Sequence, residues 1–265
     1  MELDGAAADP EALRALALVN YGHFTTMRVE DGRVRGLAAH LERLRRDCRA
    51  VFDAELDLDG VRRHLGRAVA GSAAGGGAPL IVRVTVFDPA LDLGRPSAPA
   101  APRVLVTTRP AGPLAPPPMR VVSVPYERDA PAVKHTGLFG ALHARRTAQR
   151  GGFDDALFLG RDELVSEGPT WNVGFVDADG TVVWPAAEVL PGVTMELLRR
   201  HHPHVVTPVT REAAHGMRAA FATNAGIGVR AVTAIDTAPF PPDDPVLAAL
   251  RETYRSLPAD PVRAA

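Results

Sequence analysis

The chain has 265 residues, 46% of them apolar and 23% charged, and its formal net charge is −1. This length is enough for two ordinary domains, or one large one, with a sizeable buried core. The near-zero charge gives no reason to expect nucleic acid or an anionic membrane as a partner, and no apolar run approaches the ~20 residues that a membrane span needs.

The N-terminus and the cysteine content indicate a reducing compartment. Residues 1–10 carry acidic but no basic side chains, so they lack the charged start and the apolar run of a secretory signal. Cys48 is the only cysteine, which rules out an internal disulfide. It lies among leucines at helical spacing, so we interpret it as a small buried apolar group and expect a cytoplasmic protein.

Segments rich in Gly, Pro and Ala mark the expected loops and the expected domain boundary. Loops are expected over residues 71–79 and 93–102. The strongest linker signal is RPAGPLAPPP at 109–118, because its three consecutive prolines cannot join a helix or a central strand. We therefore expect a small N-terminal domain over residues 1–109, a linker over 110–119 and a C-terminal domain over 120–265.

The first domain begins with the pattern of a β-hairpin. His23–Val29 is rich in β-forming residues, and the turn signal Asp31-Gly32 follows it. Val34 and Leu37 are then expected on a short returning strand.

The rest of the first domain mixes helices and strands. An amphipathic helix is expected where apolar side chains recur at intervals of three and four residues, at Leu37, Leu41, Leu44, Cys48 and Val51. A shorter helix is expected over residues 61–70, and strands over 80–87 and 104–108. This order predicts an α+β domain.

The second domain is expected to contain a barrel-like sheet rather than a doubly wound one, because many short strands alternate with turns and scattered helices. The expected strands cover residues 120–124, 156–159, 164–165, 173–176, 182–184, 221–223 and 229–235. The expected helices cover residues 140–150, 193–200 and 211–218, the first ended by Gly151-Gly152 and the second starting after Pro191-Gly192.

Lys134 is the only lysine among 30 Lys and Arg residues. Arginine stays protonated in proteins, whereas a desolvated lysine amine can lose its proton and attack a carbonyl. Schiff-base formation is therefore the first hypothesis for Lys134. The alternative is a lysine that survived by chance in an arginine-rich chain.

An ordered set of motifs surrounds this lysine. The set consists of AVKHT at 132–136, VSEG at 165–168 with Asn172 after it, LPGVT at 190–194 and FATNA at 221–225. In this order and spacing the motifs resemble the fold-type IV pyridoxal phosphate enzymes, which include branched-chain and D-amino acid aminotransferases and 4-amino-4-deoxychorismate lyase. FTTMRV at 24–29 and HLERL at 40–44 are similar to the lyase branch in particular. The resemblance covers nearly the whole chain.

The resemblance implies a two-domain α+β fold, with a small N-terminal α/β sandwich and a larger C-terminal pseudo-barrel, and pyridoxal 5′-phosphate as the cofactor. Lys134 is then expected to form a Schiff base with the cofactor and to move the substrate's Cα proton, which needs an amine of lowered pKa. Glu167 is expected to pair with the pyridine nitrogen, where a carboxylate strengthens the ring as an electron sink. On its own, Glu167 would be read as an exposed turn carboxylate.

The resemblance also implies a set of phosphate contacts. Arg43 is expected to bind the phosphate, for which a bidentate guanidinium is suited. Val193 and Thr194 would offer backbone N–H groups at a helix start, where the helix dipole favours an anion. Asn224 and Ala225 occupy a loop in which relatives add a contact through a hydroxyl, a group that Ala225 lacks.

The chain departs from the family pattern at two positions. Many aminotransferases of the family carry a tyrosine five residues after the lysine, and here this residue is Phe139. The lyase branch tends to lack the same tyrosine. Many relatives also have arginine after the GVT motif, where this chain has Met195.

Several further residues are candidates for the site. Thr26 matches a threonine near the substrate in lyase-like members and is a candidate catalytic residue. Tyr21, Arg28 and Trp171 are candidates to line the substrate pocket. We interpret His135 as a packing residue beside the lysine.

The histidines His201, His202 and His204 could suggest a metal site. They lack a partner carboxylate or cysteine pattern, and Pro203 interrupts them, so we expect a surface loop and no metal.

Three functions are compatible with these patterns. We favour a pyridoxal-phosphate-dependent aminotransferase acting on an amino acid and a 2-oxo acid, because the wider family consists mostly of such enzymes. The FTT motif and Phe139 favour the alternative, a lyase that converts aminodeoxychorismate to 4-aminobenzoate and pyruvate. A non-catalytic cofactor-binding paralogue is the third hypothesis, against which the retention of both Lys134 and Glu167 argues. By resemblance we expect a homodimer whose sites lie where the two domains meet.

Overall fold

The computed structural model describes residues 1–72 and 78–263 and divides into two compact units. The first unit holds residues 1–112, Val133–Gly137 and the segment that starts at Pro258, and the second holds Pro113–Ala132 and Leu138–Leu257. Most of the loop expected over residues 71–79 lies outside the described residues.

The division of the chain differs from a simple split into two consecutive domains. The first crossing, between Gly112 and Pro113, falls inside the expected linker. The segment Val133–Gly137, which contains Lys134, nevertheless belongs to the first unit, as does the end of the chain from Pro258. The expectation that residues 120–265 form one continuous domain therefore needs correction at these two segments. The physical reason is strand pairing, because both segments pair with residues of the first unit: His135 with His23, and Ala259–Pro261 with Arg33–Arg35.

The first unit is built on a five-stranded antiparallel sheet in the order β2-β1-β6-β5-β3. The strands are β1 (Glu2–Leu3), β2 (Ala6–Ala7), β3 (His23–Val29), β5 (Leu80–Phe87) and β6 (Arg103–Pro110), and the helices are α1 (Pro10–Val19), α2 (Leu37–Phe52) and α3 (Leu58–Ala70). The long strands and both later helices confirm the elements predicted from the sequence, while β1, β2 and α1 were not predicted.

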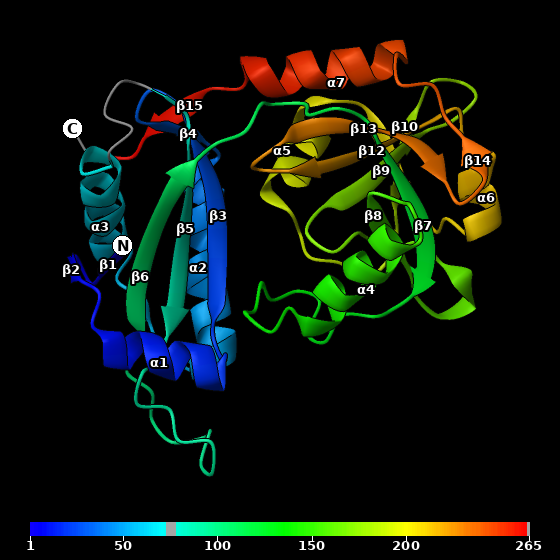
Figure 1. Cartoon of the computed structure of the whole chain (residues 1–265). Helices are drawn as coiled ribbons and strands as arrows, with labels where there is room; N and C mark the ends of the chain where they lie inside the picture. Colours follow the sequence, from blue (N-terminus) through cyan, green and yellow to red (C-terminus); the bar gives the residue numbers. More distant parts are fainter. Residues whose placement is uncertain (73–77, 264–265) are drawn as a thin grey trace. The chain divides into compact units, whose positions relative to one another are not determined.

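The two faces of this sheet differ in chemistry. Alternate residues of β3 and β5, such as Met27, Val82 and Val84, enter the core formed with α2 and α3, which cover this face (Figure 1). The opposite face carries Phe24 and Thr26 on β3 and polar residues on β5, because successive side chains of a strand point to opposite sides. Helix α1 packs at one end of this second face through the apolar cluster Leu3, Ala12, Phe87 and Leu105.

The hairpin expected after β3 is wrong in its second half. A single bridge joins Glu30 to Arg33, and the short strand β4 (Arg33–Arg35) pairs instead with β15 (Ala259–Pro261) near the end of the chain. Gly36 has a φ of +70°, a conformation that glycine adopts readily. The chain turns there, so that Leu37 begins α2 and belongs to no strand.

The second unit contains an eight-stranded mixed sheet, in which β14 pairs only with β13 and the other strands follow the order β11-β10-β9-β12-β13-β7-β8. The strands are β7 (Met119–Pro125), β8 (Asp155–Leu159), β9 (Asn172–Val176), β10 (Val182–Pro185), β11 (His204–Thr207), β12 (Ala219–Asn224), β13 (Gly228–Ile235) and β14 (Ala238–Pro239). The helices are α4 (Phe139–Arg150), α5 (Val193–His201), α6 (Arg211–His215) and α7 (Pro245–Ser256), with a 3-10 turn at Arg161–Glu163.

Isolated bridges connect the two ends of this sheet. Val165 bridges Leu159 at the end of β8, and Leu164 bridges Thr210, which follows the other edge strand β11. Val165 N–H also donates to Val209 C=O at 2.8 Å. The strand expected over 164–165 is thus reduced to single bridges, and these give the sheet its pseudo-barrel character.

Apolar clusters hold the elements of the second unit around the sheet. Phe175 and Val232 belong to one cluster that includes residues of β7, β8, β9 and β12. A second cluster joins α5 and α7 to the sheet through Leu198, Leu247 and Trp184. Helix α4 packs against β7 and β8. Helix α7 was not predicted, although Asp244 caps it and Pro245 begins it.

Two further expectations for the second unit need correction. The helix expected over 211–218 ends at His215, followed by Gly216. The histidine segment is not simply a loop, because His201 ends α5 and His204 begins β11.

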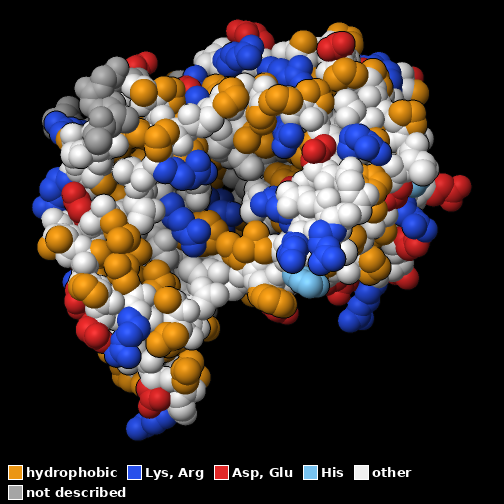
Figure 2. Space-filling view, in the orientation of Figure 1, with side chains coloured by type: hydrophobic (Ala, Val, Ile, Leu, Met, Phe, Trp, Pro, Cys, Tyr) orange, Lys and Arg blue, Asp and Glu red, His pale blue; other side chains and the backbone are white. Residues whose placement is uncertain are grey.

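The surface of the chain is mixed in charge. Basic and acidic side chains are both spread over the face in view (Figure 2). Within the described residues, no helix is long and apolar enough to cross a membrane.

Candidate active site

The lysine segment is fastened to the edge of β3 in the first unit. Phe24 N–H donates to Lys134 C=O at 2.9 Å, and a bridge pairs His23 with His135. Thr136 N–H donates to Gly22 C=O at 2.8 Å, and the Thr136 hydroxyl donates to Asn20 C=O at 2.8 Å. The backbone on both sides of Lys134 is therefore held by specific hydrogen bonds, which is what a reactive side chain on a loop requires.

Helix α2 places a polar cluster behind this segment. His40, Arg43 and Asp47 are buried and share one face of the helix. Arg43 Nη2 donates to the Thr25 hydroxyl, which also hydrogen bonds to His40 Nδ1 at 2.7 Å. Lys134 N–H donates to Asp47 Oδ2 at 3.0 Å. Together these contacts join the expected phosphate ligand Arg43 and the lysine peptide to one helix.

Burial and like charges shape the electrostatics of this cluster. Desolvation, with Arg43 and Lys134 nearby, holds the pKa of His40 well below its ordinary value, so His40 is neutral. Burial lowers the pKa of Arg43 to about 10. Arg43 Nε and His40 Nε2 are buried and make no hydrogen bond to any described residue. Such unpaired buried donors are unusual in a finished interior and fit a site that receives an anion.

The sheet face of the first unit that lies opposite to α2 and α3 carries further candidate groups. The guanidinium carbon of Arg83 lies 3.6 Å, and Lys134 Nζ 4.9 Å, from the centre of the Phe24 ring. Arg83 is opposite Thr26 in the β3–β5 register and donates from Nε to Thr85 at 3.1 Å. It forms no ion pair with the described part of the chain, and burial lowers its pKa.

Arg83 was not singled out from the sequence. The available signal was an arginine in the middle of the strand LIVRVTVF, whose other residues are apolar or threonine. Thr26, the candidate catalytic threonine, lies half-buried on the same face.

Glu167 in the second unit is a buried carboxylate, which excludes the reading of an exposed turn residue. Arg128 Nε donates to its Oε1 at 2.9 Å, with side-chain exposures of 6% and 4% for the pair. Asn172 Nδ2 contacts its Oε2 at 3.3 Å and also donates to Leu190 C=O at 2.8 Å. Asn172 thereby connects Glu167 to the turn that precedes α5.

The start of α5 has the features of an anion site. Its N-cap is Gly192, which supplies no side-chain cap, so the first N–H groups of the helix, at Val193 and Thr194, have no capping partner. The hydroxyls of Thr194 and Thr223 are buried and make no hydrogen bond within the described chain. A Cβ at Gly192 would lie 2.0 Å from Asn172 Oδ1, so the turn needs glycine. A phosphate at this helix start would satisfy its N–H groups, and the two hydroxyls are candidates for further contacts.

The loop after β12 is organised by Asn224. Its Oδ1 accepts from Gly226 N–H at 2.9 Å and from Ile227 N–H at 3.1 Å, and its Nδ2 donates to Thr170 C=O at 3.1 Å. The Asn224 side chain is therefore used within the loop, which leaves the backbone of Asn224 and Ala225 for any cofactor contact. Met195 is buried in the α5–α7 cluster, where an arginine could not be accommodated without a partner.

The candidate substrate residues lie in different surroundings. Tyr21 is exposed, stacks edge-on against Phe52 and donates to Val51 C=O at 3.2 Å. Arg28 pairs with Glu30 at 2.7 Å. Trp171 is in the second unit's core and its indole N–H donates to Asp155 at 2.8 Å.

Phe139 begins α4 with 82% of its surface exposed, and its ring stacks on His143.

The predicted residues are divided between the two units. The first unit holds Lys134, Arg43, Thr26, Tyr21 and Arg28. The second unit holds Glu167, Val193, Thr194, Asn224, Ala225 and Trp171.

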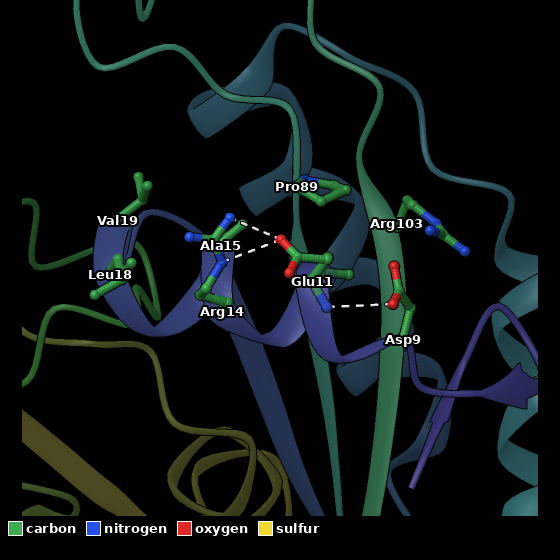
Figure 3. Close-up of a pocket in the computed structure, with 9 residues that line it drawn as sticks. Asp9, Glu11, Arg14, Ala15, Leu18, Val19, Pro89 and Arg103 are labelled. Carbon is green, nitrogen blue, oxygen red and sulfur yellow. Dashed lines mark hydrogen bonds and ion pairs between the residues drawn. The ribbon is translucent and has the colours of Figure 1, made fainter.

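Other features of the chain are less suited to chemistry. A depression of about 340 Å³ lies along α1, where Arg14 pairs with Glu11 and Asp9 caps the helix (Figure 3). Its charged side chains are engaged with protein partners, Arg103 with Asp4 among them. Within the described residues, no group of at least three His, Cys, Asp or Glu side chains could hold a metal ion.

Solved structures share this fold. A branched-chain aminotransferase from Thermoproteus uzoniensis with norvaline has a TM-score of 0.84 at 22% identity, over 99% of this chain and 98% of that chain. A proposed 4-amino-4-deoxychorismate lyase from Legionella pneumophila has a TM-score of 0.79 at 22% identity, over 92% and 93%. A hypothetical aminotransferase from Mycobacterium tuberculosis in its pyridoxal-phosphate-bound form has a TM-score of 0.79 at 19% identity, over 91% and 90%.

These likenesses confirm the fold-type IV α+β fold expected from the sequence. No curated protein sequence matches the chain. Residues 22–235 match the family model of class IV aminotransferases, a family that uses pyridoxal phosphate. Because this match spans most of its length, the chain belongs to the class IV aminotransferase family.

Proposed function

We propose that this protein is a pyridoxal-phosphate-dependent aminotransferase that moves an amino group between an amino acid and a 2-oxo acid, with Lys134 as its reactive amine. One observation carries the proposal. The chain's only lysine has both its N–H and its C=O fixed, and its amine lies over the Phe24 ring, 4.9 Å from the centre. Family membership alone would not say whether Lys134 is the reactive amine. A fixed peptide beside a cationic cluster is suited to a nucleophile.

The residues present fit a phosphate-bearing cofactor. In the second unit, the start of α5 and the hydroxyls of Thr194 and Thr223, which have no partner among the described residues, are candidates to hold the phosphate. In the first unit, Arg43 is the candidate. Glu167, oriented by Arg128, would face the ring nitrogen. When bound, pyridoxal phosphate supplies an electron sink for the negative charge that develops at the substrate's Cα.

The chain's own residues would then handle the proton and the substrate. The Lys134 amine would act as the base that takes the Cα proton and returns it, a role that needs hydrogen-bond reach to the reacting atom. Arg83 has a guanidinium without a carboxylate partner in the described chain, so it is our candidate for the substrate carboxylate. Thr26 is opposite Arg83 in the register and would then lie beside that carboxylate.

One observation favours the lyase as a second candidate. Phe139 takes the position of the tyrosine found in many aminotransferases, and a phenyl ring cannot donate a hydrogen bond. Both reactions start with the same proton removal at Lys134. The two reactions would differ in the fate of that proton, which an aminotransferase would deliver to a new position, whereas a lyase would release a β-substituent from the substrate.

Absorbance and product analysis test the proposal. Purified protein is mixed with pyridoxal phosphate, then with single amino acids, and conversion to the pyridoxamine form is followed at saturating substrate. We expect conversion by at least one amino acid in the wild type and none in Lys134→Ala. Arg109→Gln, on an exposed part of β6, is a control that should behave as the wild type.

Each outcome favours one candidate. Formation of 4-aminobenzoate and pyruvate from aminodeoxychorismate, with no half-reaction on any amino acid, would replace the aminotransferase by the lyase. Cofactor binding with neither reaction would favour the non-catalytic paralogue.

A further inference from the structure

Asp47 is a buried carboxylate that touches the backbone of the reactive lysine. Its side chain is 1% exposed, and its Oδ2 accepts the Lys134 N–H at 3.0 Å. Its Oδ1 accepts from Arg46 Nη2 at 2.8 Å and from Arg46 Nε at 3.1 Å. One oxygen therefore binds the lysine segment, and the other binds a half-exposed arginine.

The groups around Asp47 and Lys134 are mostly cationic or neutral bases. Helix α2 contributes His40, Arg43 and Arg46, while β3 contributes His23 and β5 contributes Arg83. His135 follows the lysine on its own segment. Asp47 is the carboxylate that lies among these cationic and neutral groups. A buried charge of this kind is costly to desolvate unless its partners are well placed, so its position beside the lysine peptide calls for an explanation.

Folding stability alone explains this arrangement poorly. Arg46 is half-exposed, and a pair with one solvated partner contributes little to stability. The other anchors of the lysine segment, to Gly22, Phe24 and Asn20, are backbone groups of the first unit. Asp47 hydrogen bonds to Lys134 itself and lies on α2, the helix that also carries Arg43.

We propose that Asp47 is a positioning residue for Lys134, fixing the lysine peptide through Oδ2 and supplying the negative charge that balances the amine against the surrounding cations. The proposal rests on the role given to Lys134 above. Asp47 acts through Lys134 and makes no contact with substrate in this proposal. Removal of the Asp47 charge would lower the pKa of the Lys134 side-chain nitrogen and so favour its unprotonated state. Removal of the Arg46 charge would raise that pKa.

The single lysine makes the contact directly measurable. Protein labelled only with [15N]lysine gives one backbone amide signal, that of Lys134. We expect this amide to exchange slowly in the wild type and in Asp47→Asn, whose amide oxygen still accepts, and fast in Asp47→Ala. Asp88→Asn is the matched control, because Asp88 is a buried carboxylate of the same unit that accepts from Ala90 N–H and Ala101 N–H at 2.8 Å. It should leave the Lys134 amide unchanged.

A pH titration of bound pyridoxal phosphate measures the charge effect. The midpoint of the absorbance change should fall in Asp47→Asn, because loss of a negative charge disfavours the protonated form of the Lys134 nitrogen. It should rise in Arg46→Gln, a substitution at a half-exposed side chain that the fold tolerates, and stay in place in Asp88→Asn.

The outcomes separate this proposal from the function it rests on. Slow exchange of the Lys134 amide in Asp47→Ala would overturn the proposal whatever the enzyme does. Unchanged midpoints in both Asp47→Asn and Arg46→Gln would also overturn it. If Asp47 variants fail to fold, the Arg46→Gln midpoint decides alone. If wild-type protein binds no cofactor at Lys134, the proposed function fails, and the amide measurement still decides whether Asp47 holds the lysine.

Discussion

Arg128 and Glu167 form a buried ion pair, and its removal should be the most damaging charge substitution in the second unit. The two side chains are 6% and 4% exposed, and their closest atoms are 2.9 Å apart. Arg128→Ala leaves Glu167 buried without its ion-pair partner. Breaking such a pair from one side costs about 3–5 kcal/mol of unfolding free energy. For a chain of this size this corresponds to a fall in Tm of roughly 6–20 °C.

The fluorescence of the chain offers a suitable assay. The two tryptophans, Trp171 and Trp184, both lie in the second unit, so urea unfolding followed by their emission reports on the unit that contains the pair. Arg211→Ala is the matched control, because the Arg211–Glu163 pair has a similar closest distance of 2.8 Å but side-chain exposures of 44% and 61%. An exposed pair should contribute at most about 1 kcal/mol.

A double substitution tests the reasoning behind the magnitude. Glu167→Gln in the Arg128→Ala background removes the buried charge that has lost Arg128 and keeps an oxygen for Asn172. The double variant should therefore be more stable than Arg128→Ala. If Arg128→Ala costs no more than the Arg211→Ala control, or if the double variant is less stable than the single one, the buried charge is not the source of the loss.

Three other predictions concern single residues. Gly192→Ala should weaken pyridoxal phosphate binding in an equilibrium titration, because the new Cβ would lie 2.0 Å from Asn172 Oδ1, so that the Asn172 side chain or the turn before α5 must shift; unchanged affinity would contradict a phosphate site at the start of α5. Thr194→Val should leave the cofactor-free stability almost unchanged, since the hydroxyl has no partner in the described chain, yet should weaken cofactor binding, and equal affinity would remove Thr194 from the phosphate site. Burial lowers the pKa of His23 from 6.5 to about 3. The stability that neutral His23 allows is therefore complete above pH 6.5 and is lost at about 1.4 kcal/mol per pH unit as the pH falls toward 3. His23→Leu should flatten the acid side of the curve of unfolding free energy against pH, and an unaltered slope would contradict the lowered pKa of His23.

Local patterns predicted the long elements of the first unit well. The 3- and 4-residue spacing of apolar side chains predicted α2, and the run LIVRVTVF predicted β5 with its observed bounds. The strand His23–Val29 was also predicted with its observed bounds. In each case the signal is contained within the element itself.

Elements that depend on distant partners could not be predicted in the same way. Strand β4 pairs with β15 from the end of the chain, and no local feature near Val34 reveals that partner. The pairing of Val133–Gly137 with β3 is equally non-local, so the lysine was assigned to the wrong unit. Register between distant segments is set by packing, which periodicity does not report.

The candidate site shows the same division. Lys134 and Glu167 were found through ordered motifs, and the loss of the family's tyrosine at Phe139 was visible in the sequence. The partners of these residues, Asp47 and Arg128, carried no motif and emerged only from contacts in the structure. Sequence therefore indicated which groups could react, and the structure indicated what holds them.

The most direct test of the account is to find the nitrogen that binds the cofactor. The chain has two primary amines, the Lys134 side chain and the N-terminus. Borohydride reduction with pyridoxal phosphate, followed by peptide mass spectrometry, should place the cofactor on the Lys134 peptide at one equivalent per chain. Cofactor bound tightly but absent from that peptide, or found only at the N-terminus, would contradict the central claim.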